Sequence, residues 1–280
     1  MIDPQKDYIL RGRNHVPGWF SRLDAEIVWL LTEHQNANAL DGSLVEIGLH
    51  HGKSFIAMCL ALQPGQRAYG IDLFERQSLN RDRSGKGSRE AVENNLKAAG
   101  VDLSRVILDA RASTSVTPED ILGSVGAVRF FSIDGGHQID IVRSDLVLAE
   151  RVLAPHGIIA LDDFLRPEWP DVSAGYFAWF AHRLKPLVPF AIGFNKLYLC
   201  DEHQVASCTA VLRSSAFLRC FLAKHYDFCG SEIPVYQKYP QPEWRWRTRM
   251  VEYVKLYHPD LYVRLRELRS SLHPFRPVQR

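Results

Sequence analysis

Cysteine is scarce in this sequence, and its spacing fits neither a disulfide framework nor a zinc site. The five cysteines are odd in number, and none stands in a C-x-x-C pair. Such usage is typical of reduced thiols in a reducing compartment. We therefore expect a cytoplasmic protein without structural zinc.

Long hydrophobic runs and a strong net charge are also missing. No 18 apolar residues stand together, and the first residues lack an apolar signal core, so we expect no transmembrane segment and no secretory signal. The formal net charge of +2 is too small to indicate a nucleic-acid partner. With 280 residues, 46% of them hydrophobic, the chain fits one domain of about 200 residues with appendages.

Internal repeats and low-complexity tracts are absent, and strand-like and helix-like segments alternate instead. Continuous apolar runs typical of strands buried on both faces stand at 44–47, 68–71, 106–108, 128–133 and 157–161. Segments 188–192 and 196–200 resemble a closing antiparallel pair. This pattern predicts an α/β fold: a Rossmann-like, doubly wound, mostly parallel sheet with an antiparallel closing strand.

We divide the chain into three parts. Residues 1–40 form an N-terminal helical segment, irregular to residue 17 and then helical from a Ser21 cap to about His34. Residues 41–200 form the core. Residues 201–280 form a helical, basic and aromatic extension with helices at 211–225 and 250–268. The arginines and aromatic residues of this extension suit a membrane surface, a partner or nucleic acid, but they also suit an ordinary solvated face. A homo-oligomer is compatible with the sequence.

The segment 44–54, LVEIGLHHGKS, reads as a strand, a tight loop and a helix start. Its glycines, Gly48 and Gly52, allow a sharp turn and let a ligand lie against bare backbone. We infer a cofactor site here, against the alternative of a plain strand–helix turn with glycines for packing.

The spacing in this loop decides between cofactors. It is one residue too short for a phosphate-binding P-loop, and His50 breaks the G-x-G-x-x-G pattern of dinucleotide sites. An acid about 20 residues after the loop is placed to hold the hydroxyls of a ribose, and Asp72 stands there. This suits an adenosyl ligand such as S-adenosylmethionine. Ser113 follows the third strand, where it can border the adenine or merely cap a loop.

The segment 76–89 is polar and rich in Lys and Arg. A long loop after the second strand is suited to a lid or to recruiting a substrate, whereas the alternative is a solvated connection.

Acidic residues follow most of the predicted strands and should share one edge of the sheet. They are Glu46, Asp72, Asp134, Asp162 and Asp163. The last three end neighbouring strands and would repel one another without a cation between them, so we expect a divalent ion, Mg²⁺ or alternatively Ca²⁺ or Mn²⁺. Such an ion would bind a substrate hydroxyl and lower its pKa.

A base must take the proton of that hydroxyl, and His137 is the candidate, with Asp134 as its rival. His50 and His51 also lie near the expected pocket. For each histidine the alternative is a purely structural role.

Taken in order, the motifs V-E-I-G-x-x-x-G-x-S, I-D-L, I-D-G-x-H and L-x-P-x-G-x-I-A-L-D-D-F resemble the class I S-adenosylmethionine-dependent methyltransferases. Within them the sequence is most similar to the Methyltransf_24 group, which includes metal-dependent sugar O-methyltransferases. The resemblance covers residues 43–200. His156 stands where the group usually has glycine, and Gly136-His137 replaces the D-G-D-x-Y of the macrolide enzymes.

The resemblance implies a role for each motif residue. Glu46, Gly48, Gly52 and Ser54 line the methionine end of the cofactor, and Asp72 holds the ribose. Asp134, Asp162 and Asp163 are the Mg²⁺ ligands, and Asp134 also borders the cofactor and competes with His137 as the base.

We therefore expect a methyltransferase that depends on S-adenosylmethionine and a divalent metal and acts on a hydroxyl of a sugar, in a glycan or glycosylated metabolite. One alternative is methylation of a phenolic diol. The other is a non-catalytic module that docks a partner or a membrane.

Overall fold

The computed structural model describes residues 3–237 and the single residues 250, 254, 258, 261, 264 and 265. The chain divides into two units, Met1–Gln237 and Lys238–Arg280. The helix expected over 250–268 and most of the basic, aromatic tail lie outside the described residues. Among the residues that are described, no helix has the length and apolar character needed to cross a membrane.

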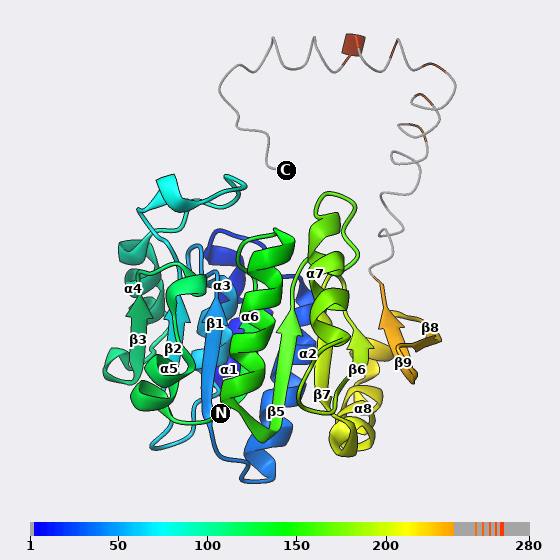
Figure 1. Cartoon of the computed structure of the whole chain (residues 1–280), viewed down its shortest axis with the longest axis horizontal. Helices are drawn as coiled ribbons and strands as arrows, with labels where there is room; N and C mark the ends of the chain where they lie inside the picture. The colour runs from blue at the N-terminus through cyan, green and yellow to red at the C-terminus, as the bar shows by residue number, and fades with distance from the viewer. Residues whose placement is uncertain are drawn as a thin grey trace. The chain divides into compact units, whose positions relative to one another are not determined.

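A mixed sheet in the order β3-β2-β1-β4-β5-β7-β6-β9-β8 forms the centre of the first unit (Figure 1). The strands β3, β2, β1, β4 and β5 are parallel, and β7 runs antiparallel to both β5 and β6. This confirms the expected Rossmann-like sheet with its antiparallel closing strand. The strands are β1 Ser43–Ile47, β2 Ala68–Ile71, β3 Val106–Asp109, β4 Val128–Ile133, β5 Leu153–Leu161, β6 Leu187–Ile192, β7 Leu197–Asp201, β8 Leu222–Phe228 and β9 Ser231–Tyr236.

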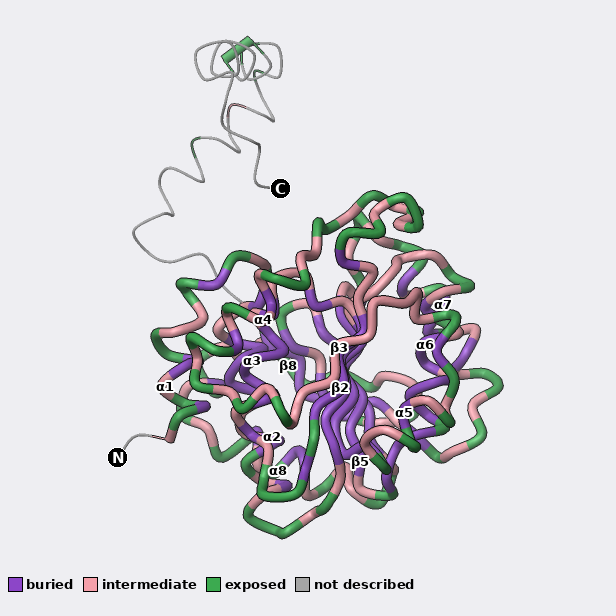
Figure 2. The backbone as a smooth tube through the Cα atoms, turned by 90° about the vertical axis from the view of Figure 1, so that its left-hand side faces the viewer, coloured by how far each residue is buried: buried purple, intermediate pink, exposed green. Residues whose placement is uncertain are grey.

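Helices cover both faces of this sheet (Figure 2). One layer contains α1 (Pro4–Leu10), α2 (Arg22–Ala37), α3 (Lys53–Cys59), α4 (Arg89–Ala98) and α8 (Val205–Ser214), and the short α9 (Ala216–Arg219) follows α8. The other layer contains α5 (Pro118–Val125), α6 (Ile139–Val152) and α7 (Pro170–Phe180).

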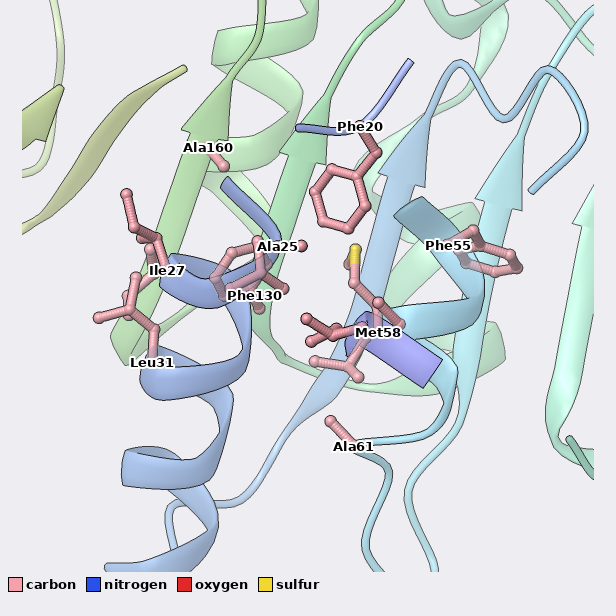
Figure 3. Close-up of a cluster of buried hydrophobic side chains, with 14 of the residues drawn as sticks. Phe20, Ala25, Ile27, Leu31, Phe55, Met58, Ala61, Phe130 and Ala160 are labelled. Atoms are coloured by element: carbon pink, nitrogen blue, oxygen red, sulfur yellow. The ribbon is translucent and has the colours of Figure 1, made fainter. Parts of the chain in front are cut away.

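Successive side chains of a strand point to opposite faces, so each central strand supplies both cores. In β1, Leu44 packs with the first layer, whereas Val45 and Ile47 pack with the second. Figure 3 shows Phe130 of β4 and Ala160 of β5 in the cluster of the first layer. Burial on both faces explains why the strand sequences are continuously apolar.

Two expectations for the ends of the unit were wrong. Residues 4–10 are helical because Asp3 caps the backbone of Gln5 and Pro4 starts the helix, where a missing N–H costs nothing. The expected helix over 211–225 ends at Ser214, and β8 and β9 form a hairpin that extends the sheet. The hairpin turns at Cys229 and Gly230, which both have positive φ angles, as a tight two-residue turn requires.

Candidate active site

The loop between β1 and α3 is the strand–loop–helix turn that the sequence predicts, and its glycines are sterically required. Gly48 has a φ of +82°, and a Cβ there would lie 1.7 Å from the backbone oxygen of Asp134. Gly52 also has a positive φ and is the residue from which α3 starts. The loop is therefore pressed against the end of β4, so the first and fourth strand ends share one site.

Glu46 lies completely buried at the end of β1. Its Oε1 accepts a hydrogen bond from the Ser132 hydroxyl at 2.9 Å, while Oε2 has no hydrogen-bond partner among the described residues. Burial raises the pKa of Glu46 to about 7, although Lys196 and the hydroxyls of Ser54 and Ser132 act in the opposite direction. An unsatisfied buried acceptor is costly, and a cationic ligand group would relieve that cost.

Asp72 follows β2 and lies beside the same loop. Its Oδ2 accepts the backbone N–H groups of Leu49 and His50 at 2.7 and 2.8 Å, and its Oδ1 accepts that of Phe74 at 2.6 Å. Gly87 packs so close that a Cβ there would lie 2.6 Å from Oδ1. Asp72, which we expect to bind the ribose, thus lies next to the glycine loop. In this arrangement its carboxylate accepts backbone N–H groups and Gly87 covers it.

Ser113 lies after β3 in a short 3-10 turn that packs against α6. Its neighbour there is Asp145, a completely buried carboxylate of α6. Burial raises the pKa of Asp145 to about 7, and the Ser113 hydroxyl opposes this shift. Asp109, at the end of β3, is held by the Tyr69 hydroxyl at 2.6 Å and by Arg111 at 2.7 Å.

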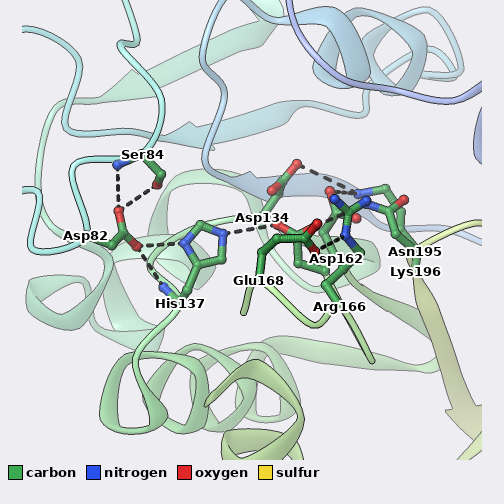
Figure 4. A network of polar contacts seen from close by, with 10 residues as sticks. Asp82, Ser84, Asp134, His137, Asp162, Arg166, Glu168, Asn195 and Lys196 are labelled. Carbon is green, nitrogen blue, oxygen red and sulfur yellow. Dashed lines mark hydrogen bonds and ion pairs between the residues drawn. The ribbon is translucent and has the colours of Figure 1, made fainter. Parts of the chain in front are cut away.

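Asp134 and Asp162, at the ends of β4 and β5, come together around a lysine that we did not expect (Figure 4). Nζ of Lys196 lies 2.9 Å from Oδ2 of Asp162 and 3.8 Å from Oδ2 of Asp134, and the residue is 3% exposed. Burial and the Asp162 carboxylate raise the pKa of Asp134 well above its usual value. Burial acts to raise the pKa of Asp162, but the charge of Lys196 together with the hydrogen bonds from Asp134, Lys196 and the Asp163 backbone outweighs it, so the pKa is lowered.

Asp163, the third expected metal ligand, is directed elsewhere. Its φ of +53° is unusual for a non-glycine residue and marks local strain at the site. Oδ2 contacts Nε2 of His137 at 3.1 Å, and Oδ1 accepts a hydrogen bond from the Asn195 amide at 3.2 Å. The three carboxylates therefore do not converge on one point.

His137 lies between two carboxylates. Its Nδ1 is 2.6 Å from Oδ2 of Asp82, its Nε2 contacts Asp163, and its ring stacks on Trp169 at 3.9 Å between centroids. Burial acts to lower the pKa of His137, but the hydrogen bonds to Asp163 and Asp82 outweigh it and raise the pKa to about 9. In this arrangement the expected base holds its proton at neutral pH.

Asp82 belongs to the polar loop 76–89, which therefore lies over the strand ends instead of running free in solvent. The backbone N–H and the hydroxyl of Ser84 donate to Oδ1 of Asp82 at 2.9 and 2.6 Å. His50 and His51 belong to the loop 48–54 and contact each other, and His50 also contacts Trp19. Their rings are 3.9 Å apart, and Trp19 lies 5.4 Å from His50.

Sequence reasoning missed Lys196, Asp82 and Asp24. A signal for Lys196 exists, because the antiparallel register that pairs Leu161 with Leu197 places residue 196 opposite Asp162. Asp24 lies buried at the start of α2, where its Oδ1 accepts the Tyr198 hydroxyl at 3.1 Å. Neither Asp82, in an irregular loop, nor Asp24, within a helix, has a sequence signal of this kind.

The expected magnesium ion does not fit this arrangement. The place between Asp134 and Asp162 is taken by the ammonium of Lys196, and a divalent ion beside it would be repelled. Within residues 3–237 and the single described tail positions, no three His, Cys, Asp or Glu side chains gather as a metal site would require.

Comparison with known proteins agrees with the fold. Residues 45–164 match the sequence model of the Methyltransf_24 family, a methyltransferase domain. The O-methyltransferase NovP superposes with a TM-score of 0.51 at 18% identity, over 63% of this chain and 78% of NovP. CalS11, a TDP-rhamnose 3'-O-methyltransferase of calicheamicin biosynthesis, superposes with a TM-score of 0.50 at 14% identity, over 71% of this chain and 87% of CalS11. None of the curated proteins matches the sequence.

The sheet order, the glycine loop after β1 and the acids at the strand ends define a class I methyltransferase fold. Residues 45–164 match the Methyltransf_24 model, and the protein is an S-adenosylmethionine-dependent methyltransferase, as the sequence predicts.

Proposed function

We propose that this enzyme transfers the methyl group of S-adenosylmethionine to a hydroxyl of a sugar, in a glycan or a glycosylated metabolite. The observation that carries the proposal is the arrangement at one sheet edge. A buried acid with an unsatisfied oxygen, Glu46, stands on the cofactor side, and a carboxylate-oriented imidazole, His137, stands on the acceptor side.

On the cofactor side, the donor and acceptor groups suit S-adenosylmethionine. Glu46 offers a carboxylate oxygen for the amino group of the methionine part, and Gly48 and Gly52 keep the backbone bare beside it. We assign Asp72, which lies beside the glycine loop, to the ribose, and Ser113, which follows β3, to the adenine side. When bound, S-adenosylmethionine supplies an electrophilic methyl group on a sulfonium.

On the acceptor side, a small pocket is available for a hydroxyl group. It is lined by Ile133, Asp134, Gly135, Gly136, His137, Val142, Leu161, Asp162, Asp163 and Val172. A hydroxyl that displaces Asp163 from Nε2 of His137 removes one of the two carboxylates that hold the imidazole protonated, and Nε2 then releases its proton to water. Asp82 keeps Nδ1 protonated, and the freed Nε2 accepts the hydroxyl proton as the methyl group is transferred. Asp134 is the rival base.

The choice of a sugar is supported by one relative and by one structural observation. The relative is CalS11, which has a similar fold and is described as a TDP-rhamnose methyltransferase. The structural observation is Trp169, which is half-buried and stacks one face of its ring on His137, because aromatic rings suit the C–H faces of sugars.

The proposal is tested in two steps. Calorimetry with S-adenosylmethionine should show binding to the wild type and to His137→Gln alike, because His137 is on the acceptor side. Incubation with labelled S-adenosylmethionine and a panel of nucleotide sugars, glycosides and catechols should label a sugar with the wild type, and His137→Gln should lower kcat about 10²–10⁴-fold. Absence of binding would refute the cofactor assignment. Labelling of a catechol alone would refute the sugar assignment.

A further inference from the structure

We propose that Lys196 is a built-in cation that takes the place of the divalent metal, so that the strand-end carboxylates of this methyltransferase work without a metal ion. The role of Lys196 in catalysis rests on the proposed methyl transfer. Its effect on metal binding does not, because metal binding can be measured on the folded protein alone.

The position of Lys196 follows from the sheet. β5 and β7 pair antiparallel with Leu161 opposite Leu197, and one step further along the ladder Asp162 stands opposite Lys196. Opposite charges at paired positions attract each other, and here the two side chains meet at 2.9 Å. The lysine therefore reaches the end of β5 by strand register, and no loop rearrangement is needed to bring it there.

Four acidic side chains lie near the ammonium group of Lys196. Asp162 forms the ion pair, Asp134 lies 3.8 Å away, and the buried carboxyl groups of Asp24 and Glu46 are close enough to act on the same charge. A buried ammonium requires such partners, because an unpaired charge in the protein interior is strongly destabilising. One lysine thus supplies the positive charge that a group of acids otherwise obtains from an ion.

The turn that carries Lys196 is fixed in place by α2. Oδ1 of Asp24 accepts the backbone N–H of Phe194 at 3.2 Å and the hydroxyl of Tyr198 at 3.1 Å. Gly193 lies so close to Asp24 that a Cβ there would come within 2.1 Å of Oδ1. These contacts hold the chain on both sides of Lys196, so its side chain starts from a fixed position beside the cluster.

Lys196 does not touch the small pocket at the strand ends, which Asp134, Asp162 and Asp163 line. We therefore assign it as a positioning residue that acts through Asp162 and Asp134. It keeps these two side chains together, whereas Asp163 is free to bind His137 and Asn195. A metal held by all three carboxylates would remove Asp163 from His137.

The test is a titration of metal-stripped full-length protein with Mn²⁺. The concentration of free Mn²⁺ is measured at each step by electron paramagnetic resonance. We expect no saturable binding by the wild type at millimolar Mn²⁺. In Lys196→Met the two carboxylates lose their cation, and we expect one binding site that Asp162→Asn, added to Lys196→Met, removes. Lys185→Met is the matched control, because Lys185 binds the backbone oxygen of Leu153 and should gain no site.

Stoichiometric binding of Mn²⁺ by the wild type that is lost in Asp162→Asn would overturn the proposal. So would a folded Lys196→Met that binds no ion, because the lysine would then not be what excludes it. If Lys196→Met does not fold, two measurements on the wild type still test the proposal: the Mn²⁺ titration and the effect of EDTA on cofactor affinity. Affinity for S-adenosylmethionine, measured by calorimetry with and without EDTA, should be equal. Failure to bind S-adenosylmethionine at all refutes the proposed function and leaves the Mn²⁺ result intact.

Discussion

Nδ1 of His137 lies 2.6 Å from Oδ2 of Asp82, and the backbone N–H of His137 donates to the same oxygen at 3.1 Å. These contacts join the loop after β2 to the loop after β4, two segments that are far apart in sequence. The Asp82 side chain is only 6% exposed, so the two hydrogen bonds are shielded from water. Charge-assisted hydrogen bonds of this kind are stronger than neutral ones.

The first prediction concerns this contact. Replacing Asp82 by Asn removes the charge and weakens the link, so the loop should open more often. We expect trypsin to cleave after Arg81 and Arg83 at least several-fold faster, and the free energy of unfolding to fall by about 1–3 kcal/mol. The cleavage rate is followed by mass spectrometry, and the free energy by urea denaturation.

Asp140→Asn is the matched control for Asp82→Asn. Asp140 pairs with Arg81 of the same loop at 2.7 Å, but both side chains are more than half exposed. Exposed ion pairs contribute little to stability because water screens them, so this variant should be nearly unchanged in both measurements. Equal effects of the two substitutions would show that the buried link to His137 does not hold the loop.

The second prediction concerns Glu46. Glu46→Gln keeps the size of the side chain and the contact with Ser132 but removes the negative charge. We expect the Kd for S-adenosylmethionine to rise about tenfold or more, which corresponds to about 1.4 kcal/mol. Stability at pH 8 should not fall, because the wild type bears the cost of a buried charge there.

Glu150→Gln separates this effect from general damage. Glu150 is also buried, but its Oε1 accepts the backbone N–H groups of Leu184 and Lys185, both at 2.6 Å, away from the cofactor loop. This variant should lose stability and keep its affinity for S-adenosylmethionine. A Glu46→Gln protein with wild-type affinity would remove Glu46 from the cofactor site.

The order of the elements in the core could be read from the sequence because it depends on local patterns. Continuous apolar runs mark strands buried on both faces, and the glycine loop and Ser21 mark helix starts. The hairpin β8–β9 was missed, since residues 222–228 have four exposed side chains and no clear strand pattern. Its two strands pair with each other, and the hairpin joins the sheet through Val235, which pairs with Ile192 of β6, a strand distant in sequence.

The site was predictable in composition but not in geometry. Strand ends place Asp134, Asp162 and Asp163 at one edge, as expected. Which way each side chain then points depends on partners that come from elsewhere in the chain. Lys196 attracts two of the three carboxylates and His137 attracts the third. Reading the pairing of β5 with β7 one residue further would have revealed the lysine before any metal was inferred.

The third prediction concerns pH and Asp145, whose folded pKa of about 7 lies above the ordinary value for an aspartate. A raised pKa means that the folded protein binds this proton more tightly than the unfolded chain. Stability therefore falls as the pH rises from about 4 to 7, and above pH 7 the full cost is present. The wild type should lose on the order of 3 kcal/mol over this range through Asp145.

The asparagine in Asp145→Asn does not titrate, so the variant lacks this loss of stability. Relative to the wild type, its free energy of unfolding should therefore increase as the pH rises from 4 to 8. Urea denaturation at several pH values without cofactor measures it. Asp140→Asn, on the exposed side of the same helix, should show at most a small change in this difference. A constant difference between Asp145→Asn and wild type across this range would mean that the carboxyl group is not buried as described.

The fourth prediction concerns the glycine loop. At Gly48 the φ of +82° already disfavours any side chain by about 1–2 kcal/mol, and a Cβ would also collide with the backbone oxygen of Asp134. Gly48→Ala should therefore lower the free energy of unfolding by about 3 kcal/mol or more and abolish cofactor binding. Gly100→Ala is the control, because Gly100 has a φ of +79° but nothing within 4 Å of the added carbon. It should lose only about 1–2 kcal/mol and bind S-adenosylmethionine normally. If both variants lose the same stability, backbone conformation alone determines the cost, and the close contact between the β1 loop and β4 does not constrain the site.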